Sequence, residues 1–217
     1  MQTKIRNLNL DNRAELQLAA GAGVSLDSAA KTTQGDVTVT LGVPGGNNFV
    51  PTPGTYANMN RISESLVATL ATLASGTMNL TAISLPQGVL VSTITFVSGT
   101  TAAVAPTNQL FGLYDSARLL LGATNNDAAT AWNASVPKTL TLTTPFTTLN
   151  DGLYYLACMV TVSTTMPTLT GNASIATVVG QAPILNGSSN TGLTTTLPAG
   201  PATAITALAG VPYGYVG

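Results

Sequence analysis

Three aspartates are the residues best placed to do chemistry in the central part of the chain. Asp115, Asp127 and Asp151 are, apart from Glu64, the only acidic residues between positions 58 and 180. Paired carboxylates could hydrolyse a glycoside. Each aspartate, however, stands in a turn-like context, in "YDSAR", "NNDAA" and "LNDG", where this side chain commonly accepts hydrogen bonds from the local backbone. We therefore expect turn roles and predict no catalytic residue.

The absence of histidine supports that interpretation. The sequence contains no His, so it lacks the commonest general base, the usual activator of serine and cysteine nucleophiles, and the commonest metal ligand. The glycine-rich stretches "AAGAG" and "GVPGG" do not match a phosphate-binding loop. We expect a protein that is not an enzyme and that uses no cofactor and no metal.

Three further features could bind a ligand or react, and each has a structural alternative. Asn125, Asn126 and Asp127 could offer oxygen ligands to calcium, but they lack the alternating register of a calcium loop, so we expect a polar hairpin tip. Cys158 falls on the apolar face of a predicted strand and is expected to be a buried, inert thiol. Trp132, in "ATAWNAS", could stack on a sugar ring as a glycan contact, but core filling is the expected role.

The composition excludes several classes of partner. Charged residues make up 7% of the 217 residues, and seven Lys and Arg against eight Asp and Glu give a net charge of -1, whereas soluble domains are typically about a quarter charged. Without a basic stripe, binding to nucleic acid or to an anionic membrane surface is not expected. No apolar run reaches the roughly 18 residues of a spanning helix, and no secretory signal is recognisable, so we expect synthesis in a cytoplasm. The single cysteine allows no intrachain disulfide.

The spacing of apolar residues predicts an all-β protein, an antiparallel β-sandwich over residues 58–180. "QLFGLYD" and "RLLLGAT" are predicted to form a hairpin, and "RISESLVATLATL" at 61–73 fits a helix or a strand, with strand expected. The two-residue period of a strand predicts three sets of residues that share a face: Leu90, Ile94 and Phe96; Leu140 and Leu142, opposite Thr139, Thr141 and Thr143; and Tyr154, Leu156, Cys158, Val160 and Val162.

The two ends of the chain differ from this central part. Residues 1–57 alternate apolar and polar residues and end in a segment rich in Gly and Pro, which indicates an N-terminal extended β arm of short strands. The arm has too few large apolar residues for its own core, so it needs a partner surface or, equally, its strands complete the main sheet. Residues 181–217 are expected to be an extended segment packed on the sandwich or on a neighbouring subunit. The arm residues predicted to make the partner contacts are Ile5, Leu8, Leu10, Leu16, Leu18, Val37, Val39 and Leu41.

A set of motifs between residues 75 and 165 resembles a known family. "LPQG" at 85–88, "FVSGTTA" at 96–102, "FGLYDS" at 111–116, "TAW" at 130–132 and "GLYYL" at 152–156 are together similar to the jelly-roll-like β-sandwich domain in virion proteins of tailed bacteriophages, especially those of actinobacteria. In that family the domain is attached to minor tail proteins, tail fibres and capsid-surface proteins. The resemblance therefore implies a virion component.

Two positions on the virion follow from the resemblance. The chain has no heptads, collagen repeat or β-helix period from which to build a fibre stalk, so we expect a capsid decoration protein. Such a protein, as a homotrimer, would bind the major capsid protein through the arm and stabilise the shell from the capsid surface. The alternative is a tail or head fibre protein for host attachment, with Trp132 or exposed tyrosines on host surface glycan. An enzyme that degrades the cell wall is the weakest alternative because it would have to work without histidine.

Overall fold

The computed structural model describes residues 56–57, 68–128, 130–173, 182–200 and 202–217. The chain divides into two units between Val50 and Pro51, and the described residues all belong to the second unit. Residues 1–55 of the predicted arm, which include all of its candidate contact residues from Ile5 to Leu41, lie outside the described residues. Only Tyr56 and Ala57, at the end of the predicted arm, are described.

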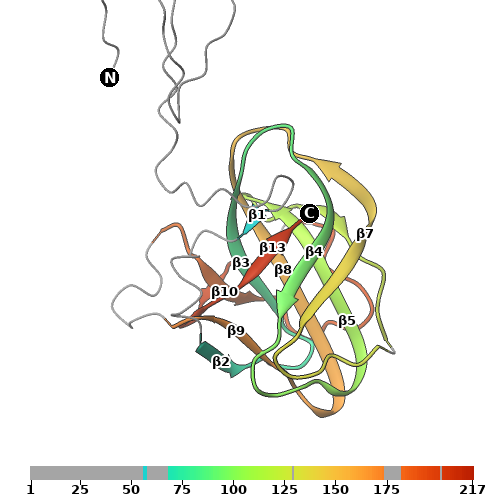
Figure 1. Cartoon of the computed structure of the whole chain (residues 1–217). Coiled ribbons are helices and arrows are strands. Elements are labelled where there is room, and N and C mark those ends of the chain that lie inside the picture. The colour runs from blue at the N-terminus through green and yellow to red at the C-terminus, as the bar shows by residue number, and fades with distance from the viewer. Residues whose placement is uncertain (1–55, 58–67, 129, 174–181, 201) are drawn as a thin grey trace, which may run out of the picture. The chain divides into compact units, whose positions relative to one another are not determined.

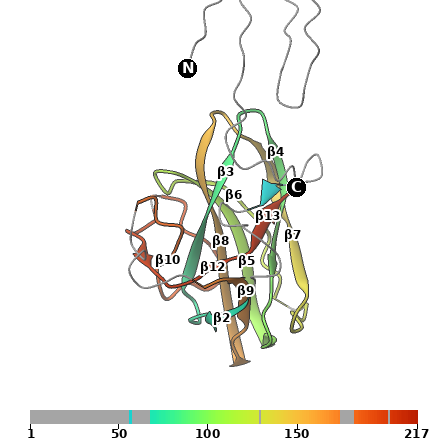
Figure 2. The same ribbon diagram turned by 60° about the vertical axis from the view of Figure 1, so that its left-hand side comes forward.

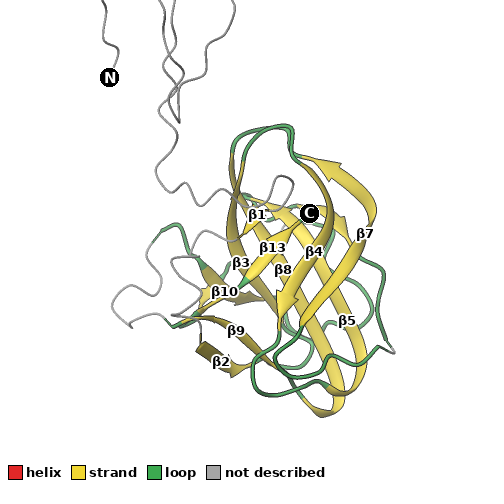
Figure 3. Ribbon diagram, viewed as in Figure 1, coloured by secondary structure: helices red, strands yellow, loops and turns green. Residues whose placement is uncertain are grey.

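The described residues form an all-β, antiparallel structure without a helix, as Figure 3 shows, which confirms the predicted fold class. Val, Ile and Thr favour the strands, and Gly and Pro mark many of the turns between them. In chain order the strands are β1 (Tyr56–Ala57), β2 (Ala68–Thr72), β3 (Met78–Leu85), β4 (Leu90–Val97), β5 (Val104–Asp115), β6 (Leu120–Ala123), β7 (Pro137–Thr147), β8 (Gly152–Thr165), β9 (Thr168–Asn172), β10 (Asn186–Ser189), β11 (Thr206–Ala207), β12 (Val211–Pro212) and β13 (Gly214–Val216).

Two main sheets face each other. The larger has the strand order β11-β10-β3-β8-β5-β6, the smaller has the order β1-β13-β4-β7, and a third sheet is β12-β9-β2. Figures 1 and 2 show β4, β7 and β13 in one layer and β3, β8 and β5 in the other. The connections from β3 to β4, from β6 to β7 and from β7 to β8 each cross between the two sheets. The architecture is therefore a sandwich, and its main core lies between these layers.

Strand β8 supplies one face to this core. The residues of β8 that line it, or that pack at its border, are the five for which the two-residue period predicted a shared face, so that prediction is confirmed: Tyr154, Leu156, Cys158, Val160 and Val162.

Strand β7 follows its predicted alternation as well. Leu142 is buried in the main core and Leu140 packs against it, whereas Thr139, Thr141 and Thr143 are exposed. The threonines of β7 therefore form part of the outer surface of the smaller sheet.

The opposite face of β8 is also buried. Tyr155, Ala157 and Met159 belong to a second apolar cluster, which Leu197 of the C-terminal segment covers. On the adjacent β5, a Cβ atom at Gly112 would lie 2.6 Å from Leu197 Cδ1, so the missing side chain allows the segment to approach the sheet closely. Because it is covered on both faces and paired with β3 and β5 at its edges, β8 is the central strand of the fold.

The C-terminal segment is an integral part of the sandwich in its described residues. Strand β10 pairs with β3, β12 pairs with β9, and β13 pairs with β4. The segment was expected to be extended and to pack on the sandwich or on a neighbouring subunit. Its strands have only two to four residues each, three of them include a glycine or a proline, and together they extend all three sheets.

A β-bulge changes which residues of β4 face the core. The two-residue period predicted that Leu90 lies on one face with Ile94 and Phe96, but Leu90 is exposed and Val91 is buried instead. The register of the β4–β7 pair shifts between Val91 and Thr93, and on the other edge of β4 the N–H groups of Ser92 and Thr93 both donate to the Gly217 carbonyl. Two adjacent residues of β4 thus stand opposite one partner residue, which is a β-bulge, and the side chains before it move to the opposite face. The prediction for Leu90 is wrong for this reason, while Ile94 and Phe96 are buried as predicted.

Two other strand predictions are confirmed. "QLFGLYD" and "RLLLGAT" lie in the hairpin of β5 and β6, whose turn Asp115 and Leu119 close. Residues 68–72 of the segment that fitted both a helix and a strand form β2. Residues 61–67 of that segment lie outside the described residues.

The bulge predicts opposite outcomes for two neighbouring substitutions. Val91→Ala should lower the free energy of unfolding by about 2 kcal/mol because it removes buried methyl groups and leaves a cavity. Leu90→Ala should change the free energy of unfolding by less than about 0.5 kcal/mol because its side chain is exposed. Urea denaturation of both variants measures the difference, and a larger loss for Leu90→Ala would contradict the bulged register.

Candidate functional site

The three aspartates accept hydrogen bonds from backbone N–H groups in turns; the predicted local partner is present for Asp115 and Asp127, whereas the partner of Asp151 lies in a turn distant in sequence. Asp115 Oδ1 accepts from Leu119 N at 2.8 Å, and Asp127 Oδ1 accepts from Thr130 N at 3.0 Å. Asp151 Oδ1 accepts from Gln87 N at 2.6 Å, across to the turn between β3 and β4. The three carboxylates thus stabilise three different turns.

Asp127 has a second role that the sequence reasoning missed. Its Oδ2 lies 2.8 Å from Lys138 Nζ, in an ion pair whose lysine side chain is 6% exposed and whose aspartate side chain is 19% exposed. The ammonium group of Lys138 also donates to the Thr130 carbonyl at 2.9 Å. The sequence did indicate that Lys138 faces inward, because it lies two residues before Leu140 and four before Leu142, which both face the core from β7. A lysine at an inward-facing position of a strand requires a buried partner.

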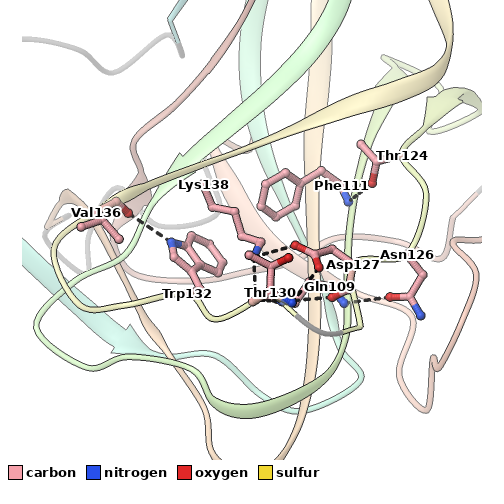
Figure 4. A network of polar contacts seen from close by, with 9 residues as sticks. All are labelled: Gln109, Phe111, Thr124, Asn126, Asp127, Thr130, Trp132, Val136 and Lys138. Atoms are coloured by element: carbon pink, nitrogen blue, oxygen red, sulfur yellow. Dashed lines mark hydrogen bonds and ion pairs between the residues drawn. The ribbon is translucent and has the colours of Figure 1, made fainter.

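Gln109 of β5 connects this ion pair to the larger sheet. Its side chain is fully buried, and its Nε2 donates to the carbonyls of Asp127 at 3.0 Å and of Thr130 at 2.8 Å. Its backbone N–H donates to Asn126 Oδ1 at 3.0 Å, and Asp127 N donates back to the Gln109 carbonyl at 3.0 Å. Figure 4 shows the side chains of Gln109 and Lys138 pointing toward Asp127 and Thr130 of the loop between β6 and β7. The loop that contains Asn125, Asn126 and Asp127, the residues considered as calcium ligands, is therefore fixed by hydrogen bonds from Gln109 and by the ion pair with Lys138.

Trp132, in the same loop, is buried in the main core. It is 1% exposed, its ring packs edge-on against Phe111 with centroids 5.8 Å apart, and its Nε1 donates to the Val136 carbonyl at 3.1 Å. A ring with both faces covered cannot stack on a sugar, so the glycan-contact interpretation of Trp132 is corrected. The core-filling alternative describes this residue.

The electrostatics of the network favour a fixed ion pair. Desolvation raises the pKa of the Asp127 carboxyl, but hydrogen bonds from Lys138 and Thr130 and the positive charge of Lys138 outweigh it and hold that pKa below its usual value. The carboxylate is therefore ionised at neutral pH and is already occupied by its donors. Such a group holds the loop in place and is poorly suited to transferring protons.

Cys158 is fully buried in the main core, as predicted. Burial raises the pKa of its thiol well above the ordinary value, because the charged thiolate is disfavoured in an apolar environment. The thiol therefore remains protonated at neutral pH.

Comparison with known proteins does not identify a family for this chain. No protein-family model and no curated protein matches this chain. Among the described residues, no group of three or more His, Cys, Asp or Glu side chains could hold a metal ion. The part of the chain that the structure describes also has no helix long and apolar enough to cross a membrane.

Removing one partner of the ion pair should lower the free energy of unfolding more than removing both partners. Asp127→Asn should lower the free energy of unfolding by about 3 kcal/mol, because it leaves the buried Lys138 ammonium without its counter-ion. The double variant Asp127→Asn, Lys138→Met should recover most of this loss, because it removes the buried charge as well. The matched control is Asp115→Asn, which keeps an oxygen for its turn. Equal losses in the single and double variants, measured by urea denaturation, would show that the ion pair is not the cause.

The lowered pKa of Asp127 predicts a pH dependence with a definite sign. Because the folded-state pKa lies below the unfolded value of about 3.9, the stabilisation is fully present above that value and is lost as the pH falls through the folded-state pKa. The difference in unfolding free energy between wild type and Asp127→Asn should be constant above about pH 5 and should shrink below about pH 4. Denaturation series at several pH values measure it, and a constant difference down to about pH 2 would contradict the assigned pKa direction.

Proposed function

We propose that this chain is a non-enzymatic structural protein of a bacteriophage virion, a capsid decoration protein that binds the outer surface of the shell and stabilises it. Its partners are the major capsid protein and further copies of itself, in a homotrimer. It is made in the host cytoplasm and is then located on the capsid surface. The N-terminal region provides the attachment, and the sandwich projects from the shell.

The observation that carries this proposal concerns the motifs behind the family resemblance. Phe96, Phe111 and Trp132 come from three separate motifs and form one row in the main core, with ring centroids 5.1 Å apart for the first pair and 5.8 Å apart for the second, both edge-on. Edge-on aromatic pairs stabilise a core beyond the area they bury. Three of the motifs therefore contribute aromatic side chains to the same core, which supports the interpretation that the motifs together mark one type of β-sandwich domain.

The neutrality of the sandwich also supports a role in assembly. The described residues include five charged side chains, those of Asp115, Arg118, Asp127, Lys138 and Asp151. All five are engaged in hydrogen bonds within the chain, and Arg118 Nε donates to the Ala202 carbonyl at 3.0 Å. A surface with so little charge binds through shape and apolar contact, and it does not steer a charged partner by long-range attraction.

The number of copies in a virion distinguishes decoration of the shell from a fibre role. Quantitative mass spectrometry of purified virions that contain this chain should find hundreds of copies per particle, because a decoration protein repeats with the capsid lattice. A handful of copies per particle would instead favour the alternative, a fibre that attaches to host glycan. The absence of the chain from purified virions would overturn both virion roles.

Attachment through the N-terminal region can be tested separately. Deleting residues 1–50 keeps β1, which pairs with β13, and should abolish binding to capsids while the unfolding transition of the sandwich is retained. Co-sedimentation with capsids from which the protein has been stripped measures the binding. Undiminished binding of the shortened chain would contradict the proposed attachment.

A further inference from the structure

The side-chain oxygen of Gln109, Oε1, is buried but accepts no hydrogen bond from the described residues. The Gln109 side chain is fully buried, two residues before Phe111 of the main core on β5. Buried amide oxygens in folded proteins almost always have a hydrogen-bond partner, in the protein or in bound water, because an unpaired one costs free energy. A partner for Gln109 Oε1 must therefore come from outside these residues.

The nitrogen end of the Gln109 side chain fixes the orientation of its amide group. Nε2 donates to the carbonyls of Asp127 at 3.0 Å and of Thr130 at 2.8 Å. Turning the amide over would place Oε1 against these two carbonyl oxygens, which have no proton to donate. Oε1 therefore faces away from both carbonyls, and a flip of the amide does not give it a partner.

The ammonium group of Lys138 has a third N–H donor beside this amide. A lysine carries three such donors, and Nζ pairs with Asp127 Oδ2 at 2.8 Å and with the Thr130 carbonyl at 2.9 Å. Gln109 Nε2 and Lys138 Nζ donate to the same Thr130 oxygen, as Figure 4 shows, so the ends of the two side chains are neighbours. Because the lysine side chain is 6% exposed, its third donor is largely shielded from bulk solvent.

We propose that one water molecule is bound between these two side chains, where it accepts a hydrogen bond from Lys138 Nζ and donates one to Gln109 Oε1. The two groups select the chemistry of the ligand. It must accept from an ammonium group and donate to an amide oxygen, and a neutral molecule such as water does both. The charge of Lys138 repels a cation, and Gln109 Oε1 has no proton to donate to an anion. The enclosed position restricts the ligand to a small molecule.

The bound water adds a second connection between the two main sheets at this point. Gln109 belongs to β5 of the larger sheet and Lys138 to β7 of the smaller sheet. The Thr130 carbonyl already joins their side chains, and the water joins them again through Oε1 and Nζ. Buried waters with several polar partners are costly to remove, so this water is part of the folded structure. The inference is independent of the proposed function because it concerns only the interior of the sandwich.

A high-resolution crystal structure of the full-length chain tests the proposal directly. It should show a water oxygen within about 3.2 Å of both Gln109 Oε1 and Lys138 Nζ. Three results would overturn the proposal: an Oε1 atom that contacts only carbon atoms, an Oε1 atom that accepts from a donor of the chain itself, or a calcium ion with oxygen ligands at about 2.3–2.6 Å.

Nuclear magnetic resonance tests the same site in solution through magnetisation transfer from water. In the wild type, the Gln109 Nε2 protons should show cross-peaks to water of opposite sign in NOE and ROE spectra, which distinguishes a bound water from proton exchange. The double variant Asp127→Asn, Lys138→Met removes the ammonium donor and should lose these cross-peaks. The matched control Asp115→Asn, in the β5–β6 turn, should keep them.

The absence of these cross-peaks from the wild type would overturn the proposal. Cross-peaks that persist in the double variant, or that the control variant loses equally, would contradict the role assigned to Lys138. A cooperative unfolding transition in the double variant shows that a loss of cross-peaks does not come from misfolding. If that variant does not fold, the two wild-type measurements decide the question by themselves.

Discussion

The burial of β8 on both faces is the constraint on which the rest of the structure depends. One face of this strand supplies the main core between the two sheets, and the other supplies the second cluster beneath the C-terminal segment. Its two edges pair with β3 and β5 along much of its length. A strand in this position must be apolar at successive residues, as "LYYLACMV" is, and its neighbours must cover it from both sides.

The other features of the molecule follow from that arrangement. The loop between β6 and β7 crosses from one sheet to the other, and Trp132, Gln109 and the Asp127–Lys138 ion pair fix it against the core. The polar side chains that could have done chemistry are thereby used to hold turns and loops. The described surface of the sandwich carries little charge. The proposed binding to the capsid and to other copies of the chain therefore depends on shape and apolar area.

Much of this fold could be predicted from the sequence, and the exceptions have physical causes. The alternation from Tyr154 to Val162 was sufficient to place five residues in the core, because a regular strand has a period of two. Leu90 was misplaced because a bulge interrupts that period, and no local signal marks it. Lys138 was overlooked although its parity along β7 points inward, and the burial of Trp132 depends on Phe111, a contact between distant parts of the chain. The pairing of β10 and β13 with β3 and β4 likewise depends on partners that are distant in sequence.

Native-state amide hydrogen exchange, resolved by residue, tests most directly whether a doubly buried β8 holds a preorganised sandwich. The amides of residues 156–160 should exchange most slowly and only through global unfolding. The amides of Gly88, Val89 and Thr148, which form hydrogen bonds between the β3–β4 turn and the end of β7, should be protected nearly as well as the adjoining strands. Exchange of the β8 amides at rates typical of exposed loops would contradict the account.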